Sequence, residues 1–253
     1  MARPSSNPAP KPVPCEHACI QLDLSEPVMP LSLNIEVPGG RTERVIERGV
    51  RLPFHHTALY STADAYQMAA EFHIVLGERP LARDNVDACR VRVRNVKWSG
   101  AGVPKIEIAF DIDKTGLITI GAANKDKKNT ELLAAIEQPH ISAEALAAAA
   151  ADAEAHAEED ARHRANIETM LAGYYLLDEA YERFSLAKRR MDFPRKRAYK
   201  NSRSRLQKAL RVMPPEATDS SMAELESALD AFREQYDGME EDFLRVKSWW
   251  GKK

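Results

Sequence analysis

The sequence predicts an α+β fold in which an antiparallel β-sandwich is followed by an α-helical domain. From residue 31 to about residue 136, apolar and polar residues alternate in short runs, a pattern typical of half-buried strands. Gly and Pro separate these runs, as they do in β-sandwiches. After His140 the apolar residues recur at steps of three and four, which indicates amphipathic helices. We therefore expect a Pro-rich arm at 1–19, a sandwich at 30–139 and a helical domain at 140–253.

Length and composition indicate the size of the core and the cellular compartment of the protein. With 253 residues, the chain is long enough to bury a substantial core. Its three cysteines form no disulfide framework, which suits a reducing compartment. The sequence contains no apolar signal-peptide region and no apolar run of membrane-spanning length. We expect a cytoplasmic protein with no membrane partner.

The N-terminal arm is rich in proline and poor in apolar side chains, so we expect residues 1–19 to be extended or disordered. Cys15, His17 and Cys19 are potential zinc ligands that lie close together. No second cluster completes a four-ligand set, and we expect no metal site.

The predicted strands place alternate residues in the core. The inward-facing sets are Leu33, Ile35 and Val37; Val91, Val93 and Val96; and Ile106, Ile108 and Phe110. Between them, Arg90, Arg92 and Arg94 fall on the solvated face. Gly39 and Gly40 stand between two strand patterns and predict a hairpin turn.

The helical domain begins with Ser142, a good N-cap residue, and Glu144 follows in the first turn. An Ala-rich helix over 143–157 continues into an apolar stripe that reaches Phe184. Pro194 is expected to break this pattern before another amphipathic helix over 199–213.

The last predicted helix opens with a capping box, Ser221-x-x-Glu224. Its apolar residues recur at alternating steps of three and four from Met222 to Trp250, which is a heptad pattern. We expect this seam to pack against the other helices of the domain. A homodimer formed through the same helix is the alternative.

Five segments, in order along the chain, resemble the substrate-binding half of the DnaK-type, 70-kDa heat-shock chaperones. They are PLSLNIEVPGG (30–40), LYSTAD (59–64), VLGERPLARDN (75–85), VPKIEIAFDID (103–113) and GLITI (116–120). No single segment would be decisive, but five in register with similar spacing are specific. The resemblance is strong over residues 20–124, fair to residue 177 and weak beyond. It implies that residues 20–29 are a linker, because Ile20, Leu22 and Asp23 resemble the short apolar segment that joins the two halves of the family.

The resemblance implies that an unfolded segment threads through the sandwich as an extended strand, with one apolar pocket for a leucine-like side chain. The pocket would be formed by Leu33, Ile35, Val37, Tyr60, Ala70, Phe72 and Ile106. Pro38 and Ala63 would form an arch over the peptide, and Ser61 and Gln67 would contact its backbone. Alternation alone equally explains the apolar residues as ordinary core.

The chain also departs from the family pattern. An ATPase domain precedes this half in the family, whereas a short Pro-rich leader precedes it here, and the sequence contains no glycine-rich phosphate loop. We therefore expect a protein that is not an enzyme and has no cofactor of its own, with ATP bound only by a separate ATPase domain or chain. Ala65 and Ala101 stand at positions whose charged residues help to latch the helical lid in the family.

Three hypotheses follow for function. The first is a holdase or adaptor that binds extended hydrophobic segments of unfolded proteins. The second is one half of a split chaperone, with a separate ATPase chain docking on the linker residues Ile20, Leu22 and Asp23, and with a J-domain co-chaperone as a further partner.

The third hypothesis is a polyanion-binding protein that uses the basic run 183–211, whose candidate residues are Arg195, Lys196, Arg197 and Lys200. The favoured interpretation of that run is a solvated helical face, and nucleic acid is not an expected partner.

Overall fold

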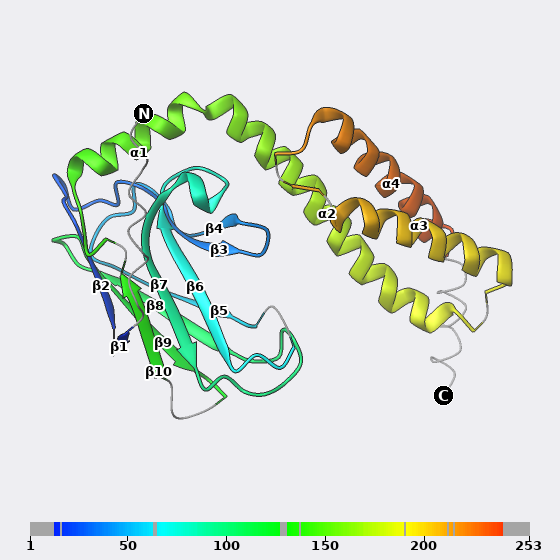
Figure 1. Ribbon diagram of the computed structural model, residues 1–253, viewed down its shortest axis with the longest axis horizontal. Helices are drawn as coiled ribbons and strands as arrows, with labels where there is room; N and C mark the ends of the chain where they lie inside the picture. The colour runs from blue at the N-terminus through cyan, green and yellow to red at the C-terminus, as the bar shows by residue number, and fades with distance from the viewer. Residues whose placement is uncertain are drawn as a thin grey trace, which may run out of the picture. The chain divides into compact units, whose positions relative to one another are not determined.

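The computed structural model describes residues 13–15, 17–62, 65–126, 131–136, 138–189, 191–211, 213–214 and 216–239. Contacts divide the chain into two units, Met1–Ala157 and Glu158–Lys253. The first unit contains two β-sheets and helix α1, and the described part of the second consists of helices (Figure 1). The predicted α+β class, a sandwich followed by helices, is confirmed.

The first unit is built from a six-stranded and a five-stranded sheet. In spatial order, the first sheet contains β1 (Val13–Cys15), β10 (Glu131–Ile136), β7 (Val86–Arg94), β6 (Ala69–Leu76), β3 (Leu33–Val37) and β4 (Arg41–Ile46). The second contains β11 (His140–Ile141), β2 (Ala18–Leu22), β9 (Leu117–Asn124), β8 (Ile106–Ile112) and β5 (Phe54–Tyr60). Neighbouring strands run antiparallel, except that β11 is parallel to β2.

The core of the sandwich follows the predicted alternation. Ile106, Ile108 and Phe110 of β8 are fully buried, whereas Glu107 and Asp111 between and beside them are not. The hairpin between β3 and β4 turns through Gly39 and Gly40, both of which have positive φ. A side chain would strain the backbone at these two positions.

The predicted linker is wrong at its start. Ala18, Ile20 and Leu22 are fully buried and belong to β2, which pairs with β9 inside the sandwich. Asp23 follows directly, and its carboxylate lies 2.8 Å from His140 Nε2. The period-two alternation of Ala18, Ile20 and Leu22 is the strand signal that the linker interpretation overlooked. Residues 1–12 and 16 of the predicted arm lie outside the described residues.

Helix α1 (Ala143–Ala155) begins as predicted. The Ser142 hydroxyl accepts a hydrogen bond from the Ala145 N–H at 3.3 Å, and this contact confirms Ser142 as the N-cap. Near the end of α1, Asp152 pairs with Arg79 at 3.1 Å, which joins the helix to the segment between β6 and β7. The contact boundary therefore falls after Ala157 rather than at residue 139, because α1 belongs to the sandwich unit.

The second unit packs α2 (Ala157–Ala187), α3 (Phe193–Arg211) and α4 (Asp219–Asp237) around one apolar cluster. The seam of α4 is buried in that cluster through Met222, Leu225, Leu229, Phe232, Tyr236 and Met239. Packing of the seam against the other helices is thus confirmed over the described residues. A homodimer through this face would need the same side chains exposed. Phe243, Val246 and Trp250 lie outside the described residues.

Two helix boundaries differ from prediction. Helix α3 starts at Phe193 rather than near Tyr199, with Pro194 in its first turn, where the missing N–H costs no helical hydrogen bond. Thr218, not Ser221, is the N-cap of α4, because the helix already begins at Asp219. Among the described helices, none combines the length and the apolar character needed to cross a membrane.

Candidate functional site

A gap between strands β3 and β6 opens the first sheet. The two strands pair only from Leu33–Leu76 to Ile35–Ile74, and the structure gives no further pairing between them within the described residues. Strand β6 continues to pair with β7 on its other side as far as Ala69. The edge of β6 from Ala69 to His73 therefore faces a gap rather than a neighbouring strand.

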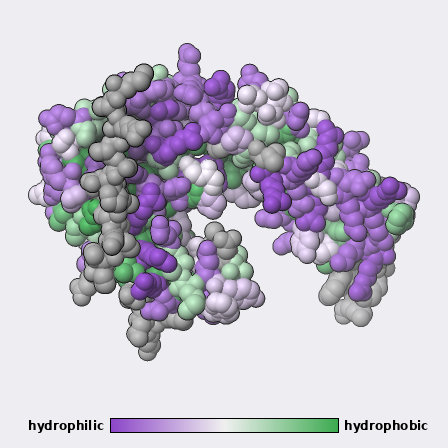
Figure 2. Space-filling model, in the orientation of Figure 1, coloured by the Kyte–Doolittle hydropathy of each residue, from purple (hydrophilic) through white to green (hydrophobic). Residues whose placement is uncertain are grey.

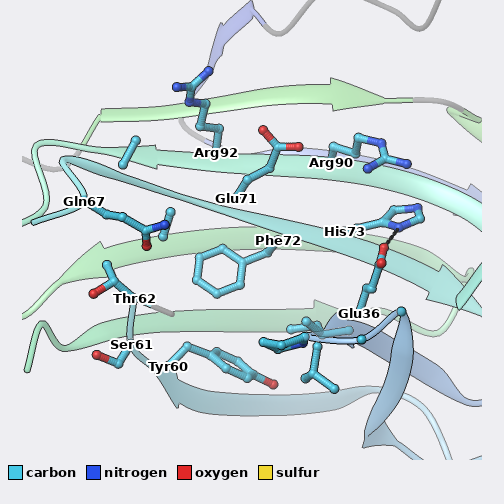
Figure 3. Close-up of a pocket in the computed structure, with 17 residues that line it drawn as sticks. Glu36, Tyr60, Ser61, Thr62, Gln67, Glu71, Phe72, His73, Arg90 and Arg92 are labelled. Carbon is cyan, nitrogen blue, oxygen red and sulfur yellow. Dashed lines mark hydrogen bonds and ion pairs between the residues drawn. The ribbon is translucent and has the colours of Figure 1, made fainter. Parts of the chain in front are cut away.

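A cavity of about 520 Å³ occupies this gap (Figure 3). Its walls come from the β3–β4 hairpin, the end of β5, and strands β6 and β7. The lining residues are Ile35, Glu36, Val37, Pro38, Gly39, Gly40, Tyr60, Ser61, Thr62, Gln67, Ala69, Ala70, Glu71, Phe72, His73, Arg90 and Arg92. Apolar residues and backbone of the turn thus meet polar side chains around one opening.

Two aromatic rings line the cavity where the sheets meet. The ring centroids of Tyr60 and Phe72 are 5.4 Å apart, and Figure 3 shows both rings directed toward the opening. Burial, and to a lesser extent the carboxylate of Glu43, raise the pKa of the Tyr60 hydroxyl well above its usual range. That hydroxyl therefore stays protonated, and can donate a hydrogen bond, throughout the physiological range. Beside the rings, the small side chain of Ala70 leaves space unfilled.

Two hydroxyl groups in the cavity wall are buried without partners. Ser61 Oγ and Thr62 Oγ1 have no hydrogen-bond partner among the residues that the structure describes. A buried polar group without a partner is costly, and most such groups in native proteins are satisfied. Both residues lie just after β5, at the edge of the opening.

The open end of β3 is held by a side-chain contact rather than by strand pairing. His73 Nδ1 of β6 lies 2.5 Å from Glu36 Oε2, and His73 Nε2 contacts the carboxylate of Asp87. His73 is largely buried, so its contact with Glu36 reaches across the gap from a fixed position (Figure 3).

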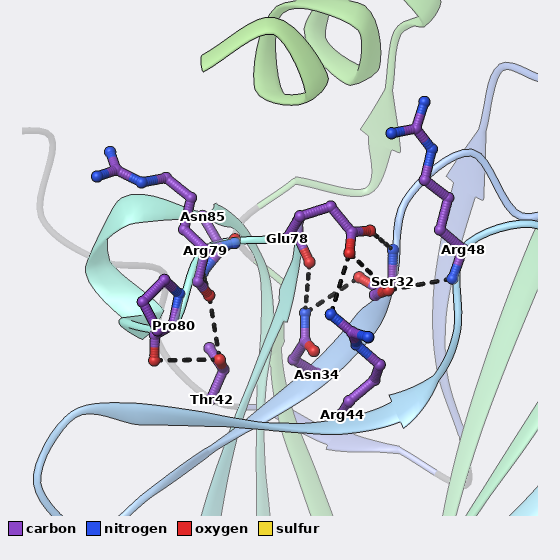
Figure 4. Close-up of polar contacts among 10 residues, drawn as sticks. Ser32, Asn34, Thr42, Arg44, Arg48, Glu78, Arg79, Pro80 and Asn85 are labelled. Atoms are coloured by element: carbon purple, nitrogen blue, oxygen red, sulfur yellow. Dashed lines mark hydrogen bonds and ion pairs between the residues drawn. The ribbon is translucent and has the colours of Figure 1, made fainter. Parts of the chain in front are cut away.

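The closed end of the same gap is fixed by a buried polar network (Figure 4). The Ser32 N–H and hydroxyl donate to the Glu78 carboxylate at 2.7 and 3.1 Å, and Asn34 Nδ2 donates to the Gly77 carbonyl at 2.8 Å. A side chain at Gly77 would place its Cβ 2.0 Å from Asn85 Oδ1, so a glycine is required there. The hairpin is thus anchored by strand pairing and polar contacts at one end, and at the other it reaches β6 through the contact of Glu36 with His73.

Of the eleven residues predicted for peptide binding, eight line the cavity. They are Ile35, Val37, Pro38, Tyr60, Ser61, Gln67, Ala70 and Phe72. Leu33 and Ile106 do not line it, because both are fully buried in the sandwich core. Ala63 lies outside the described residues.

Sequence reasoning missed most of the polar lining apart from Ser61 and Gln67. Thr62, Glu36, His73 and Arg92 all border the cavity. Alternation could have placed His73 on the face opposite Phe72, but not beside Glu36, because the pairing of β3 with β6 was not predicted.

The four predicted polyanion residues all lie in α3 but not on one face. Lys196 and Lys200 are one turn apart and share a face. Arg195 lies on another side, where its guanidinium donates to the Gly238 carbonyl. Arg197 is exposed.

Comparison with protein families gives a match to the family described as Hsp70 protein, over residues 21–238. Members of that family are ATPases, and this finding overturns the prediction that the protein is not an enzyme. The prediction depended on the short leader in place of an ATPase domain and on the lack of a phosphate-loop motif, and neither observation excludes the activity. Since the match covers most of the sequence, the chain belongs to the Hsp70 family.

Proposed function

We propose that the first unit binds extended apolar segments of unfolded proteins in the cavity between β3 and β6, as the substrate-binding part of an Hsp70 chaperone. The observation that carries this proposal is the pair of buried hydroxyls of Ser61 and Thr62, which have no partner among the described residues and lie beside an open strand edge. A bound main chain supplies the N–H and C=O groups that both features lack.

The apolar residues in the cavity lining supply the second part of the interaction. A leucine-like side chain that enters beside Ala70 would contact the Tyr60 and Phe72 rings. Its burial is worth roughly 1.5–3 kcal/mol, whereas a micromolar complex needs about 8 kcal/mol. The difference must come from flanking contacts and from main-chain hydrogen bonds. The main-chain hydrogen bonds do not depend on client sequence. Binding is therefore broad in sequence but demands one apolar residue.

Fluorescence anisotropy with a labelled heptapeptide that has a central leucine tests this proposal. We expect saturable binding to the full chain, and loss of at least tenfold in affinity when Ala70→Trp fills the cavity. The matched control is Ala172→Trp, which adds the same side chain at an exposed position of α2. A peptide with asparagine in place of the leucine should not saturate.

Equal binding by wild type and Ala70→Trp would place the peptide elsewhere and reject the proposal. Failure of the wild-type chain to bind any leucine-centred peptide would reject it as well. Circular dichroism of the two tryptophan variants checks that both remain folded.

A further inference from the structure

A second groove lies within the helical unit, between α2 and α3. It has a volume of about 640 Å³ and is lined by Tyr174, Leu177, Asp178, Tyr181, Arg203, Gln207 and Arg211. Tyr174 and Tyr181 are 47% and 56% exposed, so both rings present surface to solvent. Aromatic residues and arginine are enriched at binding interfaces relative to the rest of a protein surface.

Arg203 is the central cation of this groove. Its guanidinium lies over the Tyr181 ring, 5.2 Å from the centroid. Its Nε is buried and has no hydrogen-bond partner among the described residues. A planar donor group held against an aromatic ring, with one buried donor unsatisfied, is suited to an anionic oxygen.

The groove continues into a row of cations along α3. This helix contains eight basic residues and no acidic residue; the basic residues are Arg195, Lys196, Arg197, Lys200, Arg203, Arg205, Lys208 and Arg211. Steps of three and four residues place Lys196, Lys200, Arg203, Gln207 and Arg211 on one side of the helix. We call this set the α3 row. Residues four apart are separated by about 6 Å along the axis, which is close to the phosphate spacing of an extended single strand. The surface of this unit is largely hydrophilic in Figure 2.

We propose that the groove between α2 and α3, together with the α3 row, binds single-stranded nucleic acid. The cations would contact phosphates, and the Tyr174 and Tyr181 rings would stack on bases, the combination used by proteins that bind single strands. This proposal revises the initial expectation that the basic helix is only a solvated face.

Asp178 suits a nucleic acid among the polyanions. A carboxylate in the groove repels every polyanion, so a ligand that binds there must offer the carboxylate a hydrogen-bond donor. Nucleobases do, because cytosine, adenine and guanine carry exocyclic amino groups that Asp and Gln side chains can recognise. Asp178 and Gln207 lie together in the lining of the groove. The helices also leave no open strand edge for a peptide main chain.

The test is fluorescence anisotropy with a labelled single strand of twelve deoxycytidines and the full chain. We expect Lys200→Glu/Arg211→Glu to lower affinity at least tenfold. Arg205→Glu/Lys208→Glu is the matched control, since it makes the same charge change on the same helix, outside the α3 row. The control should lose less than about threefold.

The tyrosines test the groove independently of charge. Tyr174→Leu and Tyr181→Leu should each weaken binding about fivefold, because each removes a stacking surface. Both side chains are about half exposed, and thermal unfolding checks that the variants stay folded. Equal losses of affinity in the two double variants, or no loss of affinity in either tyrosine variant, would show that the strand does not bind in this groove. Labelled polyglutamate or phosphatidylserine vesicles that bind as tightly, with the same sensitivity to the variants, would overturn the assignment to nucleic acid.

Discussion

The two grooves of this protein differ in which polar groups lack hydrogen-bond partners among the described residues. Beside the gap between β3 and β6, backbone groups of a strand edge and two small hydroxyls lack partners within the described structure. In the helical groove the main chain is used by α2 and α3 themselves, and the orphaned donor is a guanidinium nitrogen. A strand edge suits any extended main chain, whereas a helical surface can distinguish ligands only by side-chain charge and shape. We infer that one fold class supplies broad peptide recognition and the other supplies recognition of charge.

The largest expected effect tests whether the two units are separate. Phe110 of β8 and Phe232 of α4 are both fully buried, one in each core. Truncating either to alanine should cost about 3–5 kcal/mol in the free energy of unfolding of its own unit. Hydrogen exchange followed by mass spectrometry should show faster exchange in β8 and β9 for Phe110→Ala, and in α3 and α4 for Phe232→Ala.

Exposed apolar residues provide the controls for that pair. Leu59→Ala in the sandwich and Tyr175→Ala in the helical unit remove large but exposed side chains, and neither should change exchange measurably. If either phenylalanine variant accelerates exchange throughout the chain, the units unfold together, and their comparison as separate bodies is wrong.

Both cores were largely predictable, because the patterns that reveal them lie within short stretches of the sequence. The alternation at Ile106, Ile108 and Phe110 and the heptad steps of α4 each lie within one segment, so periodicity alone reveals which side is buried. Strand β2 was not predicted, because its three alternating residues follow a proline-rich stretch and were too few to outweigh the linker interpretation.

The sites were less predictable than the cores. Eight of the residues that the resemblance implied line one cavity, but the contact between His73 and Glu36 depends on strand register. The contact of Arg203 with Tyr181 likewise depends on how two helices pack. Neither relation leaves a signal in a single sequence.

The next largest effect separates the two grooves by salt. Between 50 and 200 mM KCl, affinity for the deoxycytidine strand should fall about tenfold or more, because contacts to about three phosphates release counterions. Affinity for the leucine-centred peptide should change less than twofold, since its contacts are apolar and main-chain. Anisotropy titrations at both salt concentrations measure this. Parallel salt dependence of the two ligands would mean that both bind through charge.

A smaller effect concerns Thr62 and should differ in sign between stability and binding. Thr62→Val removes a buried hydroxyl without a described partner and keeps the shape of the side chain. The free protein should become more stable by about 1 kcal/mol, while peptide affinity falls about three- to tenfold. Denaturant unfolding and anisotropy give the two values. Unchanged affinity together with raised stability would show that the hydroxyl has no part in binding.

The smallest expected effect is a pH dependence confined to the sandwich unit. Hydrogen bonds from the Thr115 hydroxyl and from the Leu117 and Thr115 N–H groups hold the pKa of Asp113 below its usual 3.8, in the turn between β8 and β9. Because the folded-state pKa is lowered, the carboxylate stabilises the fold above pH 3.8 and loses this contribution as the pH falls through the folded value. Asp113→Ala should therefore lower the unfolding temperature at pH 7 and much less in strong acid. Hydrogen exchange should place the loss in β8 and β9, while α3 and α4 remain as in wild type at both pH values. A loss of the same size at both pH values would show that the turn depends on the shape of the side chain rather than on its charge.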